Sequence, residues 1–193
     1  YPTPIIGMIG VLEDVEKACT MDFKNEGDSI ILLGSTTEEI GGSEYLARIH
    51  GLEKGEVPFI NFALEKKLQS LILNAIEEGM LQSAHDLSEG GLAVALAESA
   101  IGGQLGAKVV INKGMRKDFL LFSEGQSRFL VTVKKEALEN LKEKMDIDKV
   151  PYEVLGEVGG EKLEVVINGA STISLDVKEM EETWRGALKC IME

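Results

Sequence analysis

The sequence predicts an α+β fold, built on a mixed or mostly antiparallel sheet that helices cover. Two observations support this prediction. Segments with strand-like and helix-like apolar patterns are mixed along the chain, without the regular alternation that is typical of a parallel sheet. Three strand-like runs then follow one another near the end of the chain and lead into a last helix, as in a β-meander followed by a helix. No repeat, low-complexity segment or linker interrupts the 193 residues, so we expect one domain over residues 1–193.

The first half of the chain is expected to contain two strands and two helices. Residues 5–12 are apolar and punctuated by glycine, and residues 29–34 include a continuous apolar run typical of a strand buried on both faces. Ser43 is a favourable N-cap for a short helix that follows it. The clearest helix covers residues 62–78, where apolar side chains recur three and four positions apart, and Gly79 follows at the expected end.

The second half begins with a helix at residues 91–101, which is rich in alanine and apolar on most sides, so we expect it to be largely buried. Two apolar runs, 119–122 and 128–133, are joined by a short polar segment, and a highly charged surface helix is expected over 134–145. The remaining elements are four strands and one helix, at residues 107–111, 152–158, 163–167, 172–177 and 177–192. An Asn-Gly pair at positions 168–169 indicates a tight hairpin turn.

The composition disfavours several kinds of partner. The formal net charge is -13 and is spread along the chain, and an acidic surface repels nucleic acid, so we expect no nucleic acid partner. No apolar run approaches the roughly 20 residues of a membrane span and no signal peptide is visible, so we expect no membrane partner and a cytoplasmic location. Cys19 and Cys190 lack any metal-binding spacing, and we expect both to be reduced. The chain starts with Tyr1 rather than Met, and we expect it to be part of a longer protein.

The most informative stretch is a predicted loop over residues 84–92, just before the buried helix. Asp86 could hold Mg²⁺, and the glycines after it would let an anion approach the amides of the first helical turn, which the helix dipole favours. The candidate phosphate- or nucleotide-binding residues are Ser88, Glu89, Gly90 and Gly91. Ser88 or Glu89 can also cap the helix, and the alternative interpretation is a capping loop with structural glycines. A nucleophilic Ser88 is disfavoured, because neighbours in sequence such as His85 and Asp86 rarely form a triad.

A second candidate site covers residues 122–129, where Glu124, Gln126 and Arg128 provide a carboxylate, an amide and a guanidinium between two apolar runs. Polar groups just outside strand ends commonly face a ligand, and Arg128 could bind a phosphate or carboxylate in a forked geometry. The alternative is a solvated hairpin turn with an ion pair. A third, glycine-rich stretch at residues 41–45 could cradle a phosphate, but it lacks the ending of a Walker loop, and a packing turn is the alternative.

Taken together, these stretches resemble a known family. The motifs are PTPIIGMIGVLED over residues 2–14, GSEY over residues 42–45 and HDLSEGGL over residues 85–92. In this order and spacing they resemble the synthetase subunit of phosphoribosylformylglycinamidine synthase, of the aminoimidazole-ribonucleotide-synthetase-like superfamily. The resemblance runs from the first residues to the last helix, and the first and third motifs are the specific ones.

The resemblance implies a fold, a reaction and partners. The fold would be a layered α/β/α sandwich, and this chain would be the last of four domains in a subunit built as two similar halves. The enzyme makes formylglycinamidine ribonucleotide from formylglycinamide ribonucleotide, ATP and glutamine in purine biosynthesis, so the cofactors would be Mg²⁺ and ATP or ADP. The partners would be the preceding domains, a glutaminase subunit, a small accessory subunit and small-molecule nucleotides.

The resemblance also assigns roles to two of the stretches. Asp86 matches an Asp that binds Mg²⁺ in the corresponding domain of the first half, and Glu124-Gly125-Gln126 matches a Glu-Ser-Gln stretch that contacts substrate there. The family's catalytic His and most of its nucleotide contacts lie in the preceding domains, so we expect no catalytic residue in this chain and no ligase activity from the chain alone. Two further alternatives stay open: a non-catalytic architectural domain that docks the glutaminase, and a domain of a relative such as aminoimidazole ribonucleotide synthetase.

Overall fold

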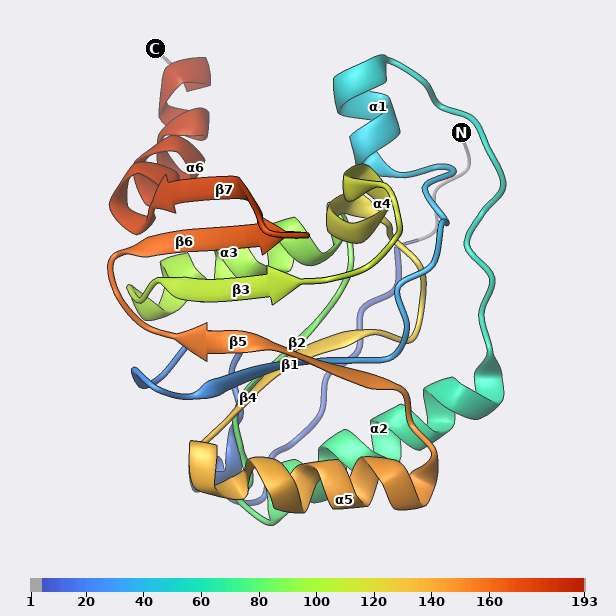
Figure 1. Ribbon diagram of the computed structural model, residues 1–193, viewed down its shortest axis with the longest axis vertical. Helices are drawn as coiled ribbons and strands as arrows, with labels where there is room; N and C mark the ends of the chain where they lie inside the picture. Colours follow the sequence, from blue (N-terminus) through green and yellow to red (C-terminus); the bar gives the residue numbers. More distant parts are fainter. Residues whose placement is uncertain (1–4, 193) are drawn as a thin grey trace.

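The computed structural model describes the backbone of residues 5–192 and the side chains of residues 5–187. Its central feature is a seven-stranded sheet with the order β2-β4-β1-β5-β3-β6-β7 (Figure 1). The strands are β1 (Ser29–Leu33), β2 (Leu81–Asp86), β3 (Ala107–Ile111), β4 (Phe129–Val133), β5 (Tyr152–Val158), β6 (Lys162–Ile167) and β7 (Ala170–Asp176). Five of the six neighbouring pairs are antiparallel, and only β3 and β6 run parallel. The predicted mixed and mostly antiparallel sheet is therefore confirmed.

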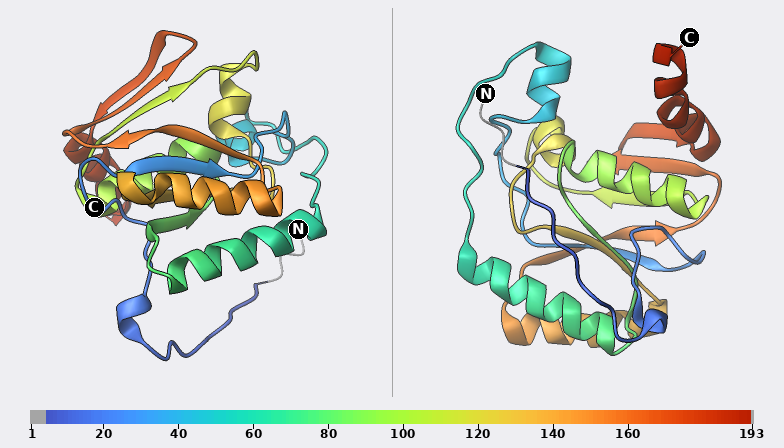
Figure 2. Two further views of the ribbon diagram at one scale, coloured as in Figure 1. Left: turned by 60° about the horizontal axis from the view of Figure 1, so that its bottom comes forward. Right: turned by 180° about the vertical axis from the view of Figure 1, so that it is seen from behind.

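Helices cover both faces of the sheet. The longer ones are α2 (Phe62–Glu77), α3 (Gly91–Gly103), α5 (Leu138–Asp148) and α6 (Val177–Met192), and the short ones are α1 (Glu44–His50), α4 (Lys117–Phe122), η1 (Val15–Lys17) and η2 (Lys135–Ala137). One apolar core joins α2 and α5 to the sheet, and a second core joins α3, α4 and the start of α6 to its other face. Figures 1 and 2 show α2 and α5 side by side, with α3 across the sheet from them. The expected α/β/α sandwich is thus confirmed.

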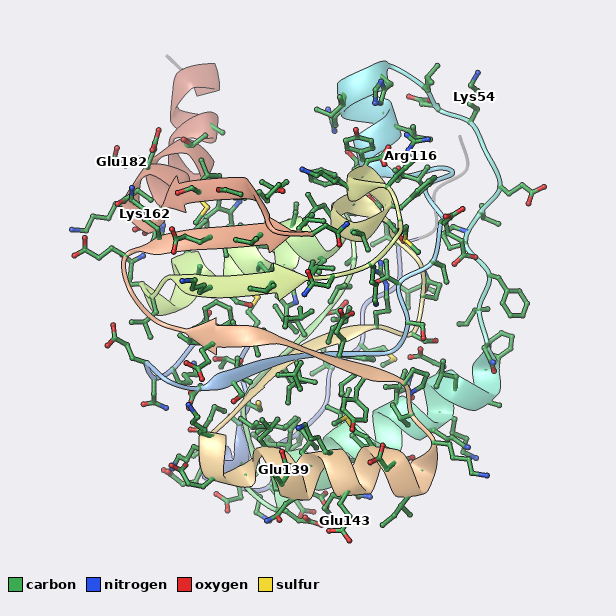
Figure 3. The ribbon with its side chains drawn as sticks, in the orientation of Figure 1. Lys54, Arg116, Glu139, Glu143, Lys162 and Glu182 are labelled. Atoms are coloured by element: carbon green, nitrogen blue, oxygen red, sulfur yellow. The ribbon has the colours of Figure 1, made fainter. Side chains whose placement is uncertain are left out.

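Strand β1 lies at the centre because its side chains are apolar on both sides. Ile30 and Leu32 belong to the α3 core, whereas Ile31 and Leu33 belong to the α2 and α5 core. All five residues of β1 are buried, as the continuous apolar run predicts. On α5, by contrast, Glu139 and Glu143 project away from the sheet, so the highly charged segment forms a surface helix as expected (Figure 3).

Three predictions about strands are wrong. Residues 5–12 form no strand but an extended segment along the outside of the molecule, where Ile9 is fully exposed (Figure 2). The β-meander is interrupted, because β3 lies between β5 and β6 and pairs with both. Gly159 and Gly160, both at positive φ, lie in the connection between β5 and β6. Residues 81–86, treated in part as loop, form β2, an edge strand whose Ser83 Oγ lies 2.6 Å from Thr132 Oγ1 of β4.

The segment before the second candidate site also differs from expectation. Residues 119–122 belong to α4, so no hairpin joins them to β4. The Asn-Gly hairpin is confirmed instead between β6 and β7, with Asn168 at φ 50° and Gly169 at φ 78°. Within residues 5–192, no helix combines the length and apolar character needed to cross a lipid bilayer. The PTP part of the first motif, at residues 2–4, lies outside the described residues, as does the side chain of Cys190.

Candidate functional site

The three stretches that the sequence singled out meet at one side chain, Glu124. Its Oε1 atom accepts a 2.8 Å hydrogen bond from the backbone N–H of Gly90 and a 3.0 Å bond from the backbone N–H of Glu44. Gly90 lies in the first stretch and Glu44 in the third, 34 and 80 residues away in sequence. A single carboxylate therefore joins the segment before α3, the start of α1 and the segment before β4.

Pairing between β2 and β4 brings the first two stretches together. Asp86, the last residue of β2, is opposite Phe129, and the N–H of Leu87 donates a 3.0 Å hydrogen bond to the carbonyl of Arg128. The Asp86 side chain is 70% exposed, so its carboxylate is available to a ligand at the end of the strand. Ser88 and Glu89 follow in an exposed turn. This edge of the sheet therefore carries an open carboxylate and a short polar turn.

The two glycines that follow have a structural reason. Gly90 and Gly91 have φ values of 78° and 61°, in the left-handed region that favours glycine. A Cβ on Gly91 would lie 2.4 Å from the carbonyl oxygen of Ser123, so α3 packs directly against the end of α4. The N-cap of α3 is Gly90 with no side-chain hydrogen bond, so the prediction that Ser88 or Glu89 caps this helix is wrong. The Glu124 carboxylate instead accepts a hydrogen bond from the N–H of Gly90 itself, just before the first helical turn, where the helix dipole favours a negative charge.

Arg128 lies beneath this surface rather than on it. The residue is 2% exposed, and its Nε donates a 3.0 Å hydrogen bond to the carbonyl of Gly125, while Nη2 donates to the carbonyl of Ser123. Burial lowers the pKa of Arg128 to about 10, and the nearby carboxylates of Glu39 and Glu124 oppose that change. The guanidinium is thus charged at neutral pH. Its third nitrogen, Nη1, has no hydrogen-bond partner among the described residues.

The residue between Glu124 and Gln126 is glycine for a steric reason. A Cβ on Gly125 would meet Thr37 Oγ1 at 2.7 Å and Glu39 Oε2 at 3.0 Å. A serine at this position would need these side chains to move. Gln126 itself is exposed, and its Nε2 lies 3.4 Å from the carbonyl of Glu124.

His85 has a role that could not be assigned from the sequence. Its Nε2 forms a 2.9 Å hydrogen bond with Oε2 of Glu98 on α3, and its Nδ1 lies 3.7 Å from Oδ1 of Asp86. A partial signal was present in the sequence, because Glu98 is the one charged residue of this helix. The ring thus ties β2 to α3 next to Asp86. Among the described residues, its polar side-chain contacts are with these two carboxylates.

The charges around the site are mostly negative, and this limits what can bind. The carboxylates gathered by these elements are Glu44, Asp86, Glu89, Glu98 and Glu124. A bare phosphate would be repelled here, whereas a phosphate that carries Mg²⁺ would not. Within the described residues, no group of three or more His, Cys, Asp or Glu side chains could hold a metal ion. The exposed Asp86 carboxylate can still supply one oxygen ligand, which suits Mg²⁺ because this ion commonly uses one or two carboxylates together with phosphate oxygens and water.

An apolar groove lies beside the site, between α3, β7 and α6. Its volume is about 580 Å³. Phe122 and Glu98 line it, and they also border the site, since Phe122 precedes Ser123 and Glu98 bonds to His85. Trp184 of α6 lines the groove and is 56% exposed. Tyr45 of α1 stacks on Phe122 with the ring centroids 4.7 Å apart, so α1 also packs against this region.

Comparison with known sequences identifies relatives along the whole chain. The family described as AIR synthase related protein, C-terminal domain, matches residues 25–168. The phosphoribosylformylglycinamidine synthase subunit PurL of Alkaliphilus metalliredigens is 55% identical over 193 residues, which are 100% of this chain and 26% of that protein. The PurL subunit of a Thermoanaerobacter species is 49% identical over the same length, with the same shares. The chain therefore spans about a quarter of the length of the curated relatives that it matches.

Solved structures share the fold. The structure described as T. maritima PurL complexed with FGAR matches with a TM-score of 0.77 and 22% identity, over 86% of this chain and 30% of that chain. The hydrogenase maturation protein HypE matches with a TM-score of 0.57 and 18% identity, over 84% of this chain and 56% of that chain. At these identities the comparison supports the layered fold rather than any one function.

Proposed function

The chain belongs to the family of AIR synthase related protein C-terminal domains, and from that premise we propose that it is the C-terminal domain of a phosphoribosylformylglycinamidine synthase synthetase subunit. The support is the 55% and 49% identity to PurL subunits over the whole chain. In this proposal residues 1–193 form a single domain, and the preceding domains of the same subunit supply the catalytic residues. The full-length subunit is then an ATP-dependent ligase of the cytoplasm.

The proposed reaction converts formylglycinamide ribonucleotide, ATP and glutamine to the amidine, with release of ADP, phosphate and glutamate. Related PurL structures from T. maritima are described as complexes with FGAR, ATP and ADP, and one is described as PurLQS. We extend these ligands to the present chain, with a glutaminase subunit and a small accessory subunit as its partners.

Within this chain, the observation that carries the proposal is the convergence on Glu124. The hydrogen bonds of Glu124 hold the turn of residues 88–91 beside the exposed Asp86. Asp86 is the proposed Mg²⁺ ligand, and the turn of Ser88, Glu89, Gly90 and Gly91 faces the nucleotide phosphates. Glu124 and Gln126 border the substrate, and Arg128 supports them from below. When bound, Mg²⁺ would neutralise phosphate charge, which this acidic edge of the sheet requires.

A change of Asp86 to Asn tests this assignment in the full-length subunit. The loss of one charged oxygen ligand should weaken Mg²⁺-ADP binding by at least about 10-fold, since even outer-shell partners of a metal contribute that much. Calorimetric titration measures this directly. Asp148→Asn is the matched control, because Asp148 lies on α5 across the sheet and is exposed. Equal affinity in the Asp86→Asn variant and the parent would refute the metal role.

A second candidate function is architectural. It is favoured by the internal contacts of three predicted ligand-binding groups: the Glu124 carboxylate, the Arg128 guanidinium and the amide of Gly90 are all bonded within the chain. In that case the domain completes the subunit and docks the glutaminase, and Asp86→Asn leaves nucleotide affinity unchanged. Loss of glutaminase binding in a pull-down, without any change in nucleotide affinity, would favour this alternative.

A further inference from the structure

Arg128 is connected to the surface of the site through Glu124. The guanidinium donates to the carbonyls of Ser123 and Gly125, which are the residues on either side of Glu124. One rigid side chain therefore holds the peptide group that precedes Glu124 and the peptide group that follows Gly125. Because the guanidinium is planar with its donors in a fixed fork, it restrains the direction in which the Glu124 side chain leaves the backbone.

The direction of Glu124 in turn sets the position of two distant segments. Its Oε1 binds the amide of Gly90, in the turn that follows Asp86, and the amide of Glu44, at the start of α1. Hydrogen bonds from amides to a charged acceptor are stronger than those to a neutral acceptor. The bond from Gly90 to Glu124 is part-buried. A shift of Glu124 would release both segments together.

A second carboxylate reinforces the same arrangement. Glu39 is the other acidic group whose charge acts on Arg128. Its Oε1 accepts a 2.7 Å hydrogen bond from the N–H of Phe59, in the segment that leads into α2, and its Oε2 lies 2.5 Å from Thr37 Oγ1. The buried positive charge of Arg128 thus lies near the carboxylates of Glu39 and Glu124. Each carboxylate accepts hydrogen bonds from backbone N–H groups of a different segment.

We propose that Arg128 is a positioning residue, which fixes Glu124 and through it the Gly90 turn beside Asp86, without touching a ligand itself. The evidence is its 2% exposure and its two bonds to backbone carbonyls. The identity of the ligand rests on the proposed function, whereas the path from Arg128 to the Gly90 amide does not. A lysine at this position keeps the charge but has a single nitrogen, so it cannot hold both carbonyls in the same geometry.

Hydrogen exchange at single amides of the full-length subunit tests the path independently of any activity. In Arg128→Lys, exchange of the Glu44 and Gly90 amides should accelerate by about 10-fold or more, because each loses a well-oriented charged acceptor. Amides of α2, across the sheet, should keep their rates. Arg116→Lys is the matched control, since Arg116 is an exposed arginine on the N-terminal side of α4 that pairs with Asp118 (Figure 3). This control should change neither amide.

A double-mutant cycle then tests whether Arg128 acts through Glu124. Glu124→Ala removes the acceptor and should give the same acceleration at both amides, and the double variant should add little to either single change. The affinity for Mg²⁺-ADP should fall in the same non-additive pattern. The midpoints of thermal unfolding should differ among the three variants. If Arg128→Lys fails to fold, Glu124→Ala alone still decides, because unchanged exchange at Glu44 and Gly90 contradicts the path.

Two results would overturn the proposal. One is Arg128→Lys with unchanged exchange at both amides, and the other is a double variant whose effects are the sum of the single ones. A parent subunit that binds no Mg²⁺-ADP would contradict the proposed function instead, and would leave the exchange result to decide the positioning role by itself.

Discussion

At the scale of single residues, the site depends on close backbone contacts that only glycine permits. Gly91 has a positive φ and faces the Ser123 and Leu121 carbonyls at 2.4 and 3.0 Å from the place of a Cβ. Gly79, after α2, also has a positive φ, but no atom lies within 4 Å of its Cβ position. A comparison of alanine substitutions at Gly79 and Gly91 therefore separates the free-energy cost of the backbone conformation from the free-energy cost of the steric clash.

Replacement of Gly91 by alanine should destabilise the chain much more than replacement of Gly79. Gly79→Ala should cost roughly 1 kcal/mol for the left-handed conformation alone. Gly91→Ala should cost at least about 3 kcal/mol, because backbone atoms of α4 would have to move as well. Urea denaturation of both variants measures the difference. Equal losses of stability would contradict the packing that the structure assigns to Gly91.

Cys19 gives a prediction of pH dependence. Burial raises the pKa of the Cys19 thiol above its usual value of 9.0, and the nearby Lys24 opposes this change only in part. The fold thus favours the neutral thiol, so the stability from this group is fully present below pH 9.0 and is lost as the pH rises through the folded-state pKa. Alkylation by iodoacetamide in a Cys190→Ser background should have its midpoint above pH 9.0 when folded. A midpoint that stays unchanged after unfolding in urea would contradict the burial.

The sequence singled out the three stretches that lie together in the structure, but it did not predict that they meet at Glu124. Asp86, Glu124 and the diglycine were found because polar residues and glycines interrupt apolar runs. The burial of Arg128 could not be predicted, because it depends on the carbonyls of Ser123 and Gly125, which a loop presents only after folding. The His85–Glu98 bond joins a strand end to a helix and required the tertiary packing to be known.

At the scale of elements, helix caps decide how independently each helix can open. Ser43 Oγ accepts a 3.2 Å hydrogen bond from the N–H of Leu46 and donates to the carbonyl of Ile40 at 2.6 Å. Asn61 Oδ1 accepts from the N–H groups of Ala63 and Leu64, both at 3.1 Å. The capped helices differ in burial, because α1 has no buried residue whereas α2 has four.

Removal of these caps should therefore have different consequences. Each change to alanine should cost about 1 kcal/mol at the helix start. In Ser43→Ala the loss should be local, seen as faster hydrogen exchange in α1 with little change in global stability. In Asn61→Ala it should lower the free energy of unfolding of the whole chain, because α2 belongs to the core. A global loss in Ser43→Ala as large as that in Asn61→Ala would contradict the peripheral place of α1.

Elements with a strong internal pattern were predictable, and those that depend on a partner were not. The helix of residues 62–78 and the buried strand at 29–34 showed clear periodicity or a continuous apolar run, and both are confirmed. Strand β2 escaped notice in part because its sequence, LQSAHD, is polar and it forms through pairing with β4 at the edge of the sheet. Residues 5–12 look like a strand in sequence but have no strand partner within the described residues.

At the scale of the whole molecule, the fold class followed from the mixture of elements, and the layered arrangement followed from the family resemblance. The strand order could not be predicted from either, because β3 pairs with β5 and β6, which lie far from it in the sequence. The assembled domain places an acidic, partly open edge beside an apolar groove of about 580 Å³. On the proposed function, such a surface would supply part of a nucleotide site that other domains complete.

The most direct test of the account is one assay of amidine formation from formylglycinamide ribonucleotide, ATP and ammonia. The full-length subunit that carries this chain and the chain of 193 residues alone would be compared at equal concentration. The account predicts turnover by the full-length subunit and none by the chain alone, because Asp86 and the Gly90 turn form only one wall of the site. Turnover by the isolated chain, or its absence from the full-length subunit, would contradict it.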